Sequence, residues 1–317
     1  MDYSVFIDQT LTKYGLPWHA EFSAYDQPWH PDHGWPIKMP DIEPGKFLVL
    51  HLPDFVTVRD GHVAEFARLE QRYGAHSRCV IVHVWNHGLA QIYQGPLNVV
   101  EFSNHNHDTA VNLLKIYPQW QSIVQQPRQG WQCLNGRLCR HRRRAVNILQ
   151  HWPQGILSYG NQIPLPQHPY ARYTQCNNQE NFLNLLTVYG TAAINIVTET
   201  LYDHSPGIVT EKTLMAIAAQ QIPIVIGHQG IVQHCRDLGF DMFDDVVDTS
   251  YDSLPNDVRV EQALLRNQDL ILGNIDLAAL QSRLQRNREF LLHHFAQQCC
   301  DRYQQQMLTV IKRLGAL

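Results

Sequence analysis

The sequence predicts an α/β fold with two domains and a pair of closing helices. Short runs of β-branched and aromatic residues alternate with segments of helical periodicity, which is typical of parallel sheets flanked by helices. The chain has 317 residues, of which 44% are hydrophobic, so it can form two cores. Its last part is rich in helix formers with apolar side chains at helical spacing. We therefore expect domains at 1–129 and 130–275, and helices at 276–317 that pack across both.

The first domain is expected to begin with an irregular, aromatic-rich segment. Residues 18–44 combine tryptophans, prolines and histidines, and this composition favours a packed loop over a helix or a strand. Strands are expected at 46–52, 79–85 and 97–102. A helix is expected to begin at Asp60, which can cap its first turn, and another at about 109–117.

The second domain is predicted from two strands joined by a loop and a helix. Apolar, β-branched residues at 194–197 suit a buried parallel strand, and those at 222–226 suit the next one. Polar side chains at the carboxyl end of a parallel strand usually face a ligand crevice. The first of these strands would bring Thr198 and Glu199 to such a crevice.

The helix between these strands is an expected anion site. Thr210 is placed to cap a helix that begins at Glu211. The first amides of a helix have no partner within it and carry positive partial charge, so they stabilise an anion such as a diphosphate. Lys212 adds a mobile positive charge, and Glu211 can accept a hydrogen bond from a sugar hydroxyl. The alternative is a surface helix start whose acid only complements the helix dipole.

A dense basic cluster follows a short strand expected at 133–135. Its members are Arg137, Arg140, Arg142, Arg143 and Arg144. A guanidinium group binds phosphate oxygens through two parallel contacts, so a phosphate site is the leading interpretation. A solvated helix face and a contact with an anionic polymer are the alternatives. On a helix, Arg140 and Arg144 share one face while Arg142 points elsewhere, so the cluster cannot all bind one ligand.

Three segments resemble a known family. They are 198–200 (TET), 209–212 (VTEK) and 223–227 (PIVIG). Their order and spacing are similar to the donor-binding half of the inverting α1,3-fucosyltransferases, which use a sugar nucleotide. The chain departs from the family at Thr200, where the family has Asn. The resemblance covers about residues 130–265.

Two further regions extend the resemblance. The segment 134–137, which contains Asn135 and Arg137, is similar to a Ser-Asn segment of the family. The family follows that segment with an arginine on the donor phosphates, and Arg142 or Arg143 is its counterpart. The stretches 238–243 and 248–252 look like a related bacterial and viral group of glycosyltransferase-like proteins.

The resemblance implies an inverting, metal-independent glycosyltransferase of the GT-B type, in which two Rossmann-like domains face a cleft. Its donor would be a nucleotide-diphosphate sugar, with a GDP-sugar as the first candidate, and its acceptor a hydroxyl group of a saccharide. No further cofactor and no metal are implied. The residues expected to bind the donor are Asn135, Arg137, Arg142, Arg143, Thr198, Glu199, Thr210, Glu211, Lys212 and Tyr251.

Inverting transfer also needs a base that takes the proton of the acceptor hydroxyl. Candidates near the ends of first-domain strands are Asp54, Glu101, His105, His107 and Asp108. We take Asp54, His107, Asp108 and the donor-orienting Glu199 as the catalytic set. An H-x-H pair with a nearby carboxylate can instead bind a metal. A metal-dependent hydrolase built on His105, His107 and Asp108 is therefore an alternative function.

Composition is that expected of a cytoplasmic protein. No run approaches the roughly 18 apolar residues of a membrane span, and the first residues do not resemble a secretion signal. The seven cysteines lack metal-site spacing, so they are expected to be reduced thiols. A net charge of −4 gives no general attraction for nucleic acid, although a nucleic-acid-directed sugar transferase and a nucleotide-binding module remain alternatives.

The acids at 241–248 are expected to form a solvated face rather than a metal motif.

Overall fold

The computed structural model describes two compact units. The described residues are 18–22, 41, 47–52, 60–75, 80–84, 93–101, 104–124, 128–136, 139–160, 185–203, 209–273 and 275–313. The first unit takes in residues 1–104 and 298–317, and the second takes in 105–205 and 209–297. The segment 105–129, which we expected in the first domain, thus belongs to the second unit.

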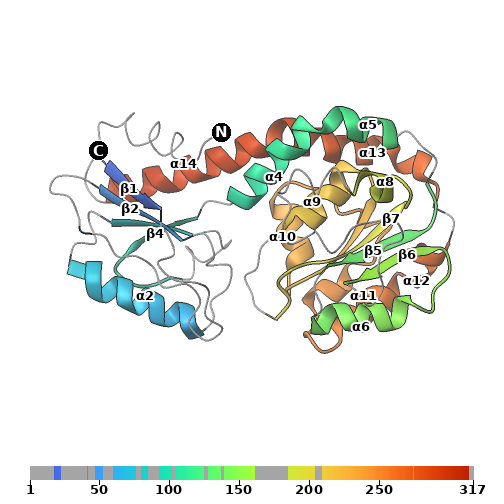
Figure 1. The fold of residues 1–317 in the computed structure, drawn as a ribbon, viewed down its shortest axis with the longest axis horizontal. Helices are drawn as coiled ribbons and strands as arrows, with labels where there is room; N and C mark the ends of the chain where they lie inside the picture. The colour runs from blue at the N-terminus through green and yellow to red at the C-terminus, as the bar shows by residue number, and fades with distance from the viewer. Residues whose placement is uncertain are drawn as a thin grey trace. The chain divides into compact units, whose positions relative to one another are not determined.

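The first unit contains a parallel sheet. Its strands, in spatial order, are β1 (Trp18–Phe22), β2 (Phe47–Leu52), β3 (Val80–Val84) and β4 (Asn98–Glu101) (Figure 1). The order of these described strands in the sheet is the same as their order in the chain, so the strand order does not reverse within this sheet. Helix α2 (Asp60–Tyr73) connects β2 to β3 and buries Leu69 and Tyr73.

Strand β1 corrects the expectation of a packed loop throughout 18–44. Trp18 pairs with Phe47 and Phe22 pairs with His51, so the segment is the edge strand of the sheet. Aromatic residues fit a pleated, half-buried surface, and pairing with β2 prevails over the composition of the residues that follow. The remainder of that segment, apart from Asp41, lies outside the described residues.

The second unit contains another parallel sheet with a different order. Its strands, in spatial order, are β6 (Gly155–Tyr159), β5 (Trp131–Asn135), β7 (Ile194–Thr198) and β8 (Ile222–Ile226). The chain runs from β5 to β6 on one side and then returns to β7 on the other, so the order reverses between β5 and β7. Strands β5 and β7 pair only at their amino ends, where Trp131 pairs with Ile194 and Gln132 pairs with Asn195. The sheet therefore opens between the carboxyl ends of β5 and β7.

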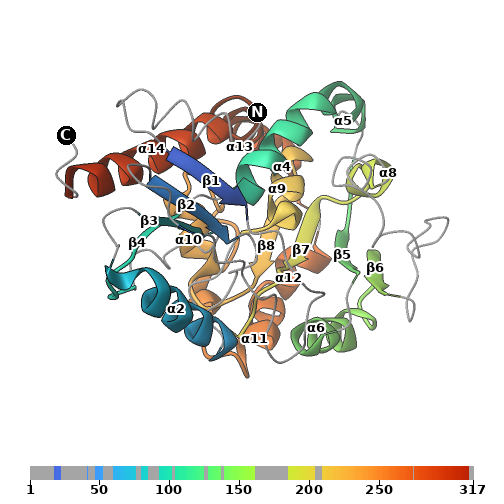
Figure 2. The same ribbon diagram turned by 60° about the vertical axis from the view of Figure 1, so that its left-hand side comes forward.

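Helices cover both faces of this second sheet. On one face lie α6 (Arg140–Leu149) and α11 (Arg259–Arg266), which contact each other, and on the other lies α9 (Glu211–Ala218) (Figure 1, Figure 2). Strands β7 and β8 are buried along their whole length, as expected of a parallel sheet covered on both sides. In the described part of the chain, the other helical elements between 104 and 277 are α4 (Asn104–Lys115), α5 (Tyr117–Val124), α8 (Leu186–Tyr189), α10 (Ile231–Asp237), η3 (Ser250–Ser253) and α12 (Gln268–Leu272).

The closing helices form one continuous run. Helix α13 (Leu277–Glu289) contacts α9 and passes through a π-helical turn, η4 (Phe290–Phe295), into α14 (Ala296–Arg313). The aromatic rings of Phe240, Phe290 and Phe295 contact one another beneath this turn. No helix in the described part of the chain is long and apolar enough to cross a membrane.

Candidate functional site

The candidate site lies where the second sheet opens. Asn135 ends β5 and Thr198 ends β7, and the Thr198 hydroxyl donates a hydrogen bond to Asn135 Oδ1. Asn135 Nδ2 donates in turn to the carbonyl of Ser158, at 3.2 Å. The bond between Thr198 and Asn135 joins β5 and β7 where their backbones no longer pair. A parallel sheet binds ligands outside its carboxyl ends where the strand order reverses, and this is that position.

Glu199 directly follows β7 and is fully buried. Its carboxylate accepts hydrogen bonds from the amides of Thr200, at 3.2 Å, and Thr210, at 3.0 Å. The hydroxyls of Thr210 and Thr213 also donate to it, the latter at 2.6 Å. These protein donors satisfy the carboxylate, so Glu199 holds the start of α9 in place.

Thr210 precedes α9 as expected, but its side chain makes no capping hydrogen bond. Its hydroxyl donates to the Glu199 carboxylate and accepts from Lys212 Nζ, at 3.3 Å. A buried anion is a stronger acceptor than a neutral oxygen, and it also complements the positive end of the helix dipole. The buried Glu199 carboxylate therefore stabilises the start of α9, a role that we expected of the Thr210 side chain.

Helix α6 brings two basic side chains beneath the end of β7. Arg142 is buried, and its Nη2 donates to the carbonyls of Thr198, at 3.1 Å, and Glu199, at 3.4 Å. His141 Nε2 lies 2.9 Å from the same Glu199 carbonyl, so this nitrogen carries the proton. Burial, with the nearby Arg142 charge, lowers the pKa of His141 to about 4. The imidazole is therefore neutral, and it stacks on Tyr202 with ring centroids 4.7 Å apart.

Lys212 reaches the rim of this site from the first turn of α9. Its Nζ lies 2.6 Å from Glu211 Oε1, 3.2 Å from Thr200 Oγ1 and 3.3 Å from Thr210 Oγ1. The side chain is 25% exposed, so its charge reaches solvent while the stem is partly buried. Lys212 and Arg142 thus lie on either side of the 198–200 segment, one at the rim and the other in the interior.

The other arginines of the cluster point elsewhere. Arg143 is exposed, and its Nε lies 3.4 Å from the hydroxyl of Tyr159 at the end of β6. Arg144 Nη1 donates to the carbonyl of Asp257, at 2.7 Å. Of the two arginines that the resemblance offers, Arg142 is the one beside Thr198 and Glu199. Arg137 lies outside the described residues.

Tyr251 lies inside the second unit. It is fully buried, and its hydroxyl donates to the carbonyl of Val225 in β8, at 2.9 Å. Its burial raises the pKa of this phenol well above the usual value. The side chain thus ties η3 to the sheet, and we do not include it in the site.

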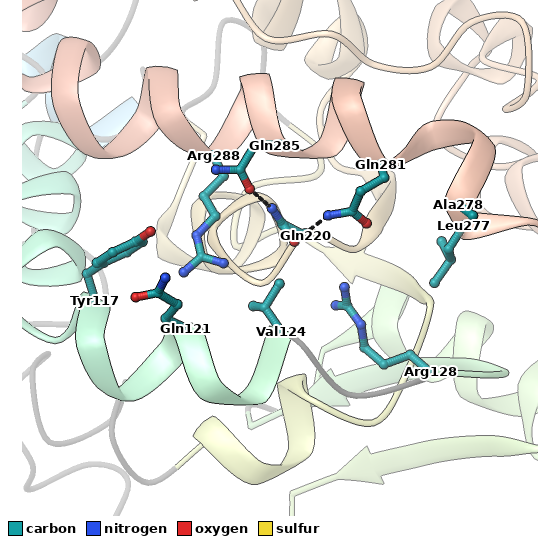
Figure 3. Close-up of a pocket in the computed structure, with 10 residues that line it drawn as sticks. All are labelled: Tyr117, Gln121, Val124, Arg128, Gln220, Leu277, Ala278, Gln281, Gln285 and Arg288. Carbon is teal, nitrogen blue, oxygen red and sulfur yellow. Dashed lines mark hydrogen bonds between the residues drawn. The ribbon is translucent and has the colours of Figure 1, made fainter.

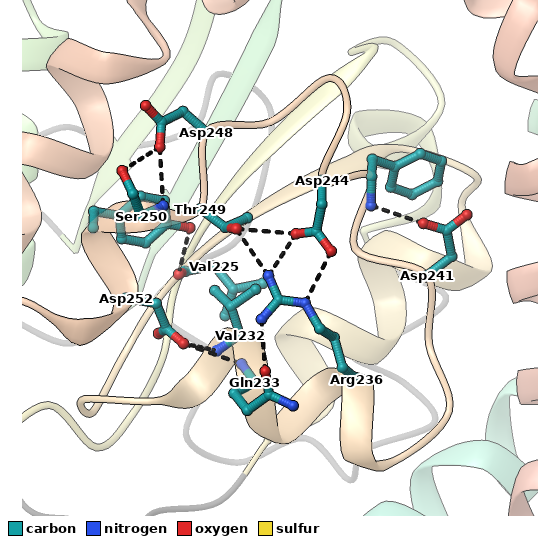
Figure 4. A network of polar contacts seen from close by, with 12 residues as sticks. Val225, Val232, Gln233, Arg236, Asp241, Asp244, Asp248, Thr249, Ser250 and Asp252 are labelled. Atoms are coloured by element: carbon teal, nitrogen blue, oxygen red, sulfur yellow. Dashed lines mark hydrogen bonds and ion pairs between the residues drawn. The ribbon is translucent and has the colours of Figure 1, made fainter.

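Most of the acids at 241–248 are exposed, as expected, and arginines pair with Asp241, Asp244 and Asp245. Figure 4 shows the pair of Arg236 and Asp244. Arg236 Nε donates to Asp244 Oδ2, at 3.0 Å, and Arg283 Nε contacts Asp241 Oδ2, at 2.6 Å. These guanidinium groups hold the pKa of Asp241 and Asp244 below the usual value. The nearby Asp252 caps α10 by accepting from the amides of 232 and 233. The segment is therefore built to fix loops rather than to bind a cation.

His107 and Asp108 lie in the first two turns of α4, which begins before the expected start at about residue 109. It contains no glycine or proline, and the apolar side chains of Ala110 and Leu113 continue on one helix face, so the helix begins earlier than expected. His107 is buried, and its Nδ1 is 3.2 Å from Asp108 Oδ1. Among the described side chains, no group of three or more suits a metal ion. Asp54 and the side chains of Glu101 and His105 lie outside the described residues.

Arg259 is a residue that sequence reasoning missed. It is fully buried and donates to the carbonyls of Gly227, at 3.1 Å, Leu254, at 2.6 Å, and Tyr202, at 3.2 Å. Its guanidinium also lies 4.7 Å from the centre of the Tyr202 ring. It therefore fixes the segments that follow β7 and β8. In the sequence it is one arginine of an amphipathic helix, and nothing distinguishes it from an exposed one.

Comparison with protein-family models, with curated proteins and with solved structures gives no match for this chain. A functional conclusion therefore depends on the geometry of the site and on the motifs of the sequence. Both concern the carboxyl edge of the second sheet.

Proposed function

We propose that this protein is a glycosyltransferase that moves a sugar from a nucleotide-diphosphate sugar to a hydroxyl acceptor, with inversion and without a metal. One observation supports the proposal most directly. Residues expected from separate motifs, Arg142, Thr198 and Lys212, meet at the point where the strand order of a parallel sheet reverses. Open α/β sheets bind nucleotides at this position.

In this proposal the start of α9 binds the diphosphate. The amides of its first turn have no partner within the helix, and Lys212 brings a charge that reaches solvent. Negative charge builds on the diphosphate as the sugar leaves, and fixed positive groups stabilise it most at that moment. Glu199 and Arg142 act as positioning residues, because they hold the end of β7 and the start of α9.

The acceptor requires a base that removes its hydroxyl proton. His107 and Asp108 are the described candidates, and Asp54 is a candidate outside the described residues. The two parallel sheets support a two-domain arrangement of the GT-B type. We assign the nucleotide to the second unit, because the described strands of the first sheet contain no reversal.

A thermal-shift screen with GDP, UDP, CMP, ADP and dTDP in the presence of a chelator tests the proposal. One nucleoside diphosphate, with GDP first, is expected to raise the unfolding temperature, because a ligand at 100 times its Kd stabilises the folded state by about 2.7 kcal/mol. Inorganic phosphate at equal ionic strength is the control. If every nucleotide leaves the unfolding temperature at the control value, the protein does not bind this class of donor.

A further inference from the structure

A second candidate site lies at the opposite edge of the same sheet. It is a cavity of about 790 Å³ whose lining residues all belong to the second unit (Figure 3). Arg128 precedes β5 and Gln220 precedes β8, so the cavity is near the amino ends of the strands. A strand of about five residues is roughly 16 Å long, so the strands separate this cavity from the carboxyl edge. The proposed donor site therefore does not include it.

Two buried arginines face this cavity. Arg128 is 8% exposed and Arg288 is 2% exposed, and both guanidinium groups point into the space between α5 and α13 (Figure 3). Arg128 Nη1 donates to the carbonyl of Ala219. Arg288 Nε and Nη2 are buried without a hydrogen-bond partner in the described part of the chain. The Arg288 guanidinium also lies 4.6 Å from the centre of the Tyr117 ring.

No described carboxylate forms an ion pair with either arginine. Glu289 follows Arg288, but its oxygens contact Gln285 Nε2 and, at 3.2 Å, His293 Nε2. Burial and the charge of Arg288 lower the pKa of Arg128 to about 10, and burial lowers that of Arg288. Two neighbouring buried cations that form no described ion pair favour an anion that completes the site.

Neutral polar groups line the rest of the cavity. Gln281 Nε2 donates to Gln220 Oε1, at 3.2 Å, and Gln220 Nε2 donates to Gln285 Oε1. Gln220 has a φ of 53°, in the left-handed region where glycine is favoured at the end of a helix. Its amide therefore stands at the cavity despite an unfavourable backbone conformation. Amide side chains both donate and accept, which suits ligand hydroxyl groups.

We propose that this cavity binds a small phosphate ester, whose phosphate contacts Arg128 and Arg288 and whose polar body contacts the glutamine side chains. The planar fork of arginine matches phosphate oxygens through two contacts. The cavity has the size of common small-molecule sites, roughly 300–1,000 Å³, and is larger than a bare ion needs. This site is additional to the proposed glycosyltransferase site.

Titration calorimetry at constant ionic strength tests the proposal with glucose 6-phosphate, inorganic phosphate and citrate. Glucose 6-phosphate is expected to bind the full chain, and inorganic phosphate more weakly, because only the ester reaches the glutamines. Binding of citrate without binding of either phosphate probe would overturn the phosphate assignment. The absence of heat with every probe would overturn the site itself.

Variants locate the binding. Arg288→Gln is expected to weaken glucose 6-phosphate about ten- to a hundredfold, because it removes a charged two-point contact. Arg286→Gln removes an exposed arginine from the same helix and is expected to leave the affinity unchanged. Arg288→Met is expected to raise the unfolding temperature without ligand, which shows that the position tolerates change. It is also expected to abolish any rise in unfolding temperature on addition of glucose 6-phosphate. Equal affinities of wild type and Arg288→Gln for glucose 6-phosphate would contradict the proposal. Lys212→Ala, which changes the proposed donor site, is expected to bind glucose 6-phosphate as the wild type does.

Discussion

Glu199 carries a carboxylate into the interior of the second unit, where backbone amides and threonine hydroxyls surround it. We expect Glu199→Gln to lower the free energy of unfolding by about 2 to 4 kcal/mol, because an amide offers one acceptor and turns a donor toward Thr210 or Thr213. Urea denaturation measures this, with the exposed Glu261→Gln as the control. Equal stability of Glu199→Gln and wild type would show that the carboxylate does not hold the start of α9.

His141 makes stability depend on pH in a defined window. Its pKa is about 4 in the folded protein and near 6.5 when unfolded, so between these values only the unfolded chain takes up the proton. The neutral His141 therefore contributes about 3 kcal/mol to the free energy of unfolding. This contribution is complete above pH 6.5 and disappears as the pH falls toward 4.

His141→Gln is therefore expected to flatten the fall in stability between pH 6.5 and 4 relative to wild type. Denaturant unfolding at a series of pH values checks it. The exposed His151→Gln is the control and should follow the wild-type curve. A His141→Gln curve parallel to wild type across this window would contradict a buried neutral imidazole.

Lys212 is the residue on which donor binding depends most directly. We expect Lys212→Ala to weaken nucleoside diphosphate binding about ten- to a hundredfold, which corresponds to the loss of one charge-assisted hydrogen bond. Calorimetry with the nucleotide found in the screen measures the change, and Lys115→Ala, at an exposed position on α4, is the control. Wild-type affinity in Lys212→Ala would remove this residue from the proposed mechanism.

At the scale of single residues, the sequence predicted positions better than contacts. The helix start at Glu211 and the strand end at Thr198 were found from local patterns, because caps, β-branched runs and apolar periodicity act within a few residues. The hydrogen bonding of the buried Glu199 depends on Thr210 and Thr213, which follow it by 11 and 14 residues and approach it only through the loop that returns to α9. Arg259 was missed for the same reason.

Elements with strong local signals were predicted closely. The strand expected at 46–52 is β2 at 47–52, and the strand expected at 79–85 is β3 at 80–84. The strand at 18–22 was missed because its pairing with β2 is not visible in its composition. Helix α4 begins earlier than expected, because the polar residues that open it carry no apolar periodicity.

Helix α13 has an N-cap whose contribution can be measured. Asp276 accepts hydrogen bonds from the amides of Ala278, at 3.0 Å, and Ala279, at 3.3 Å. Asp276→Ala is expected to lower the unfolding free energy by about 1 kcal/mol, whereas Asp276→Asn, which keeps an acceptor, should cost less. Thermal or urea unfolding distinguishes the two, and equal losses in both variants would show that the charge matters rather than the cap.

For the whole molecule, composition and alternation predicted two α/β units but not the division of the chain between them. The last residues, 298–317, belong to the first unit, although they follow the second in sequence. The strand order of the second sheet is also a property of the whole unit, because it is set by which faces the crossover helices cover. That order defines the place where β5 and β7 separate, and local patterns do not contain it.

The two proposed sites lie at opposite edges of the second sheet and differ in their chemistry. At the carboxyl edge, a helix start and Lys212 form the proposed diphosphate site. At the amino edge, Arg128 and Arg288 face the cavity. Since the strands separate them, a ligand at one edge is expected to leave the local stability of the other unchanged.

Hydrogen–deuterium exchange of the full chain, with and without the nucleoside diphosphate found in the screen, tests the central claim most directly. The account predicts slower exchange at the amides of 198–200 and 210–213, where the diphosphate would contact the start of α9 and the end of β7. Slower exchange at 219–221 and 281–288 instead, with 210–213 unchanged, would place the nucleotide in the arginine cavity and contradict the assignment of the donor site.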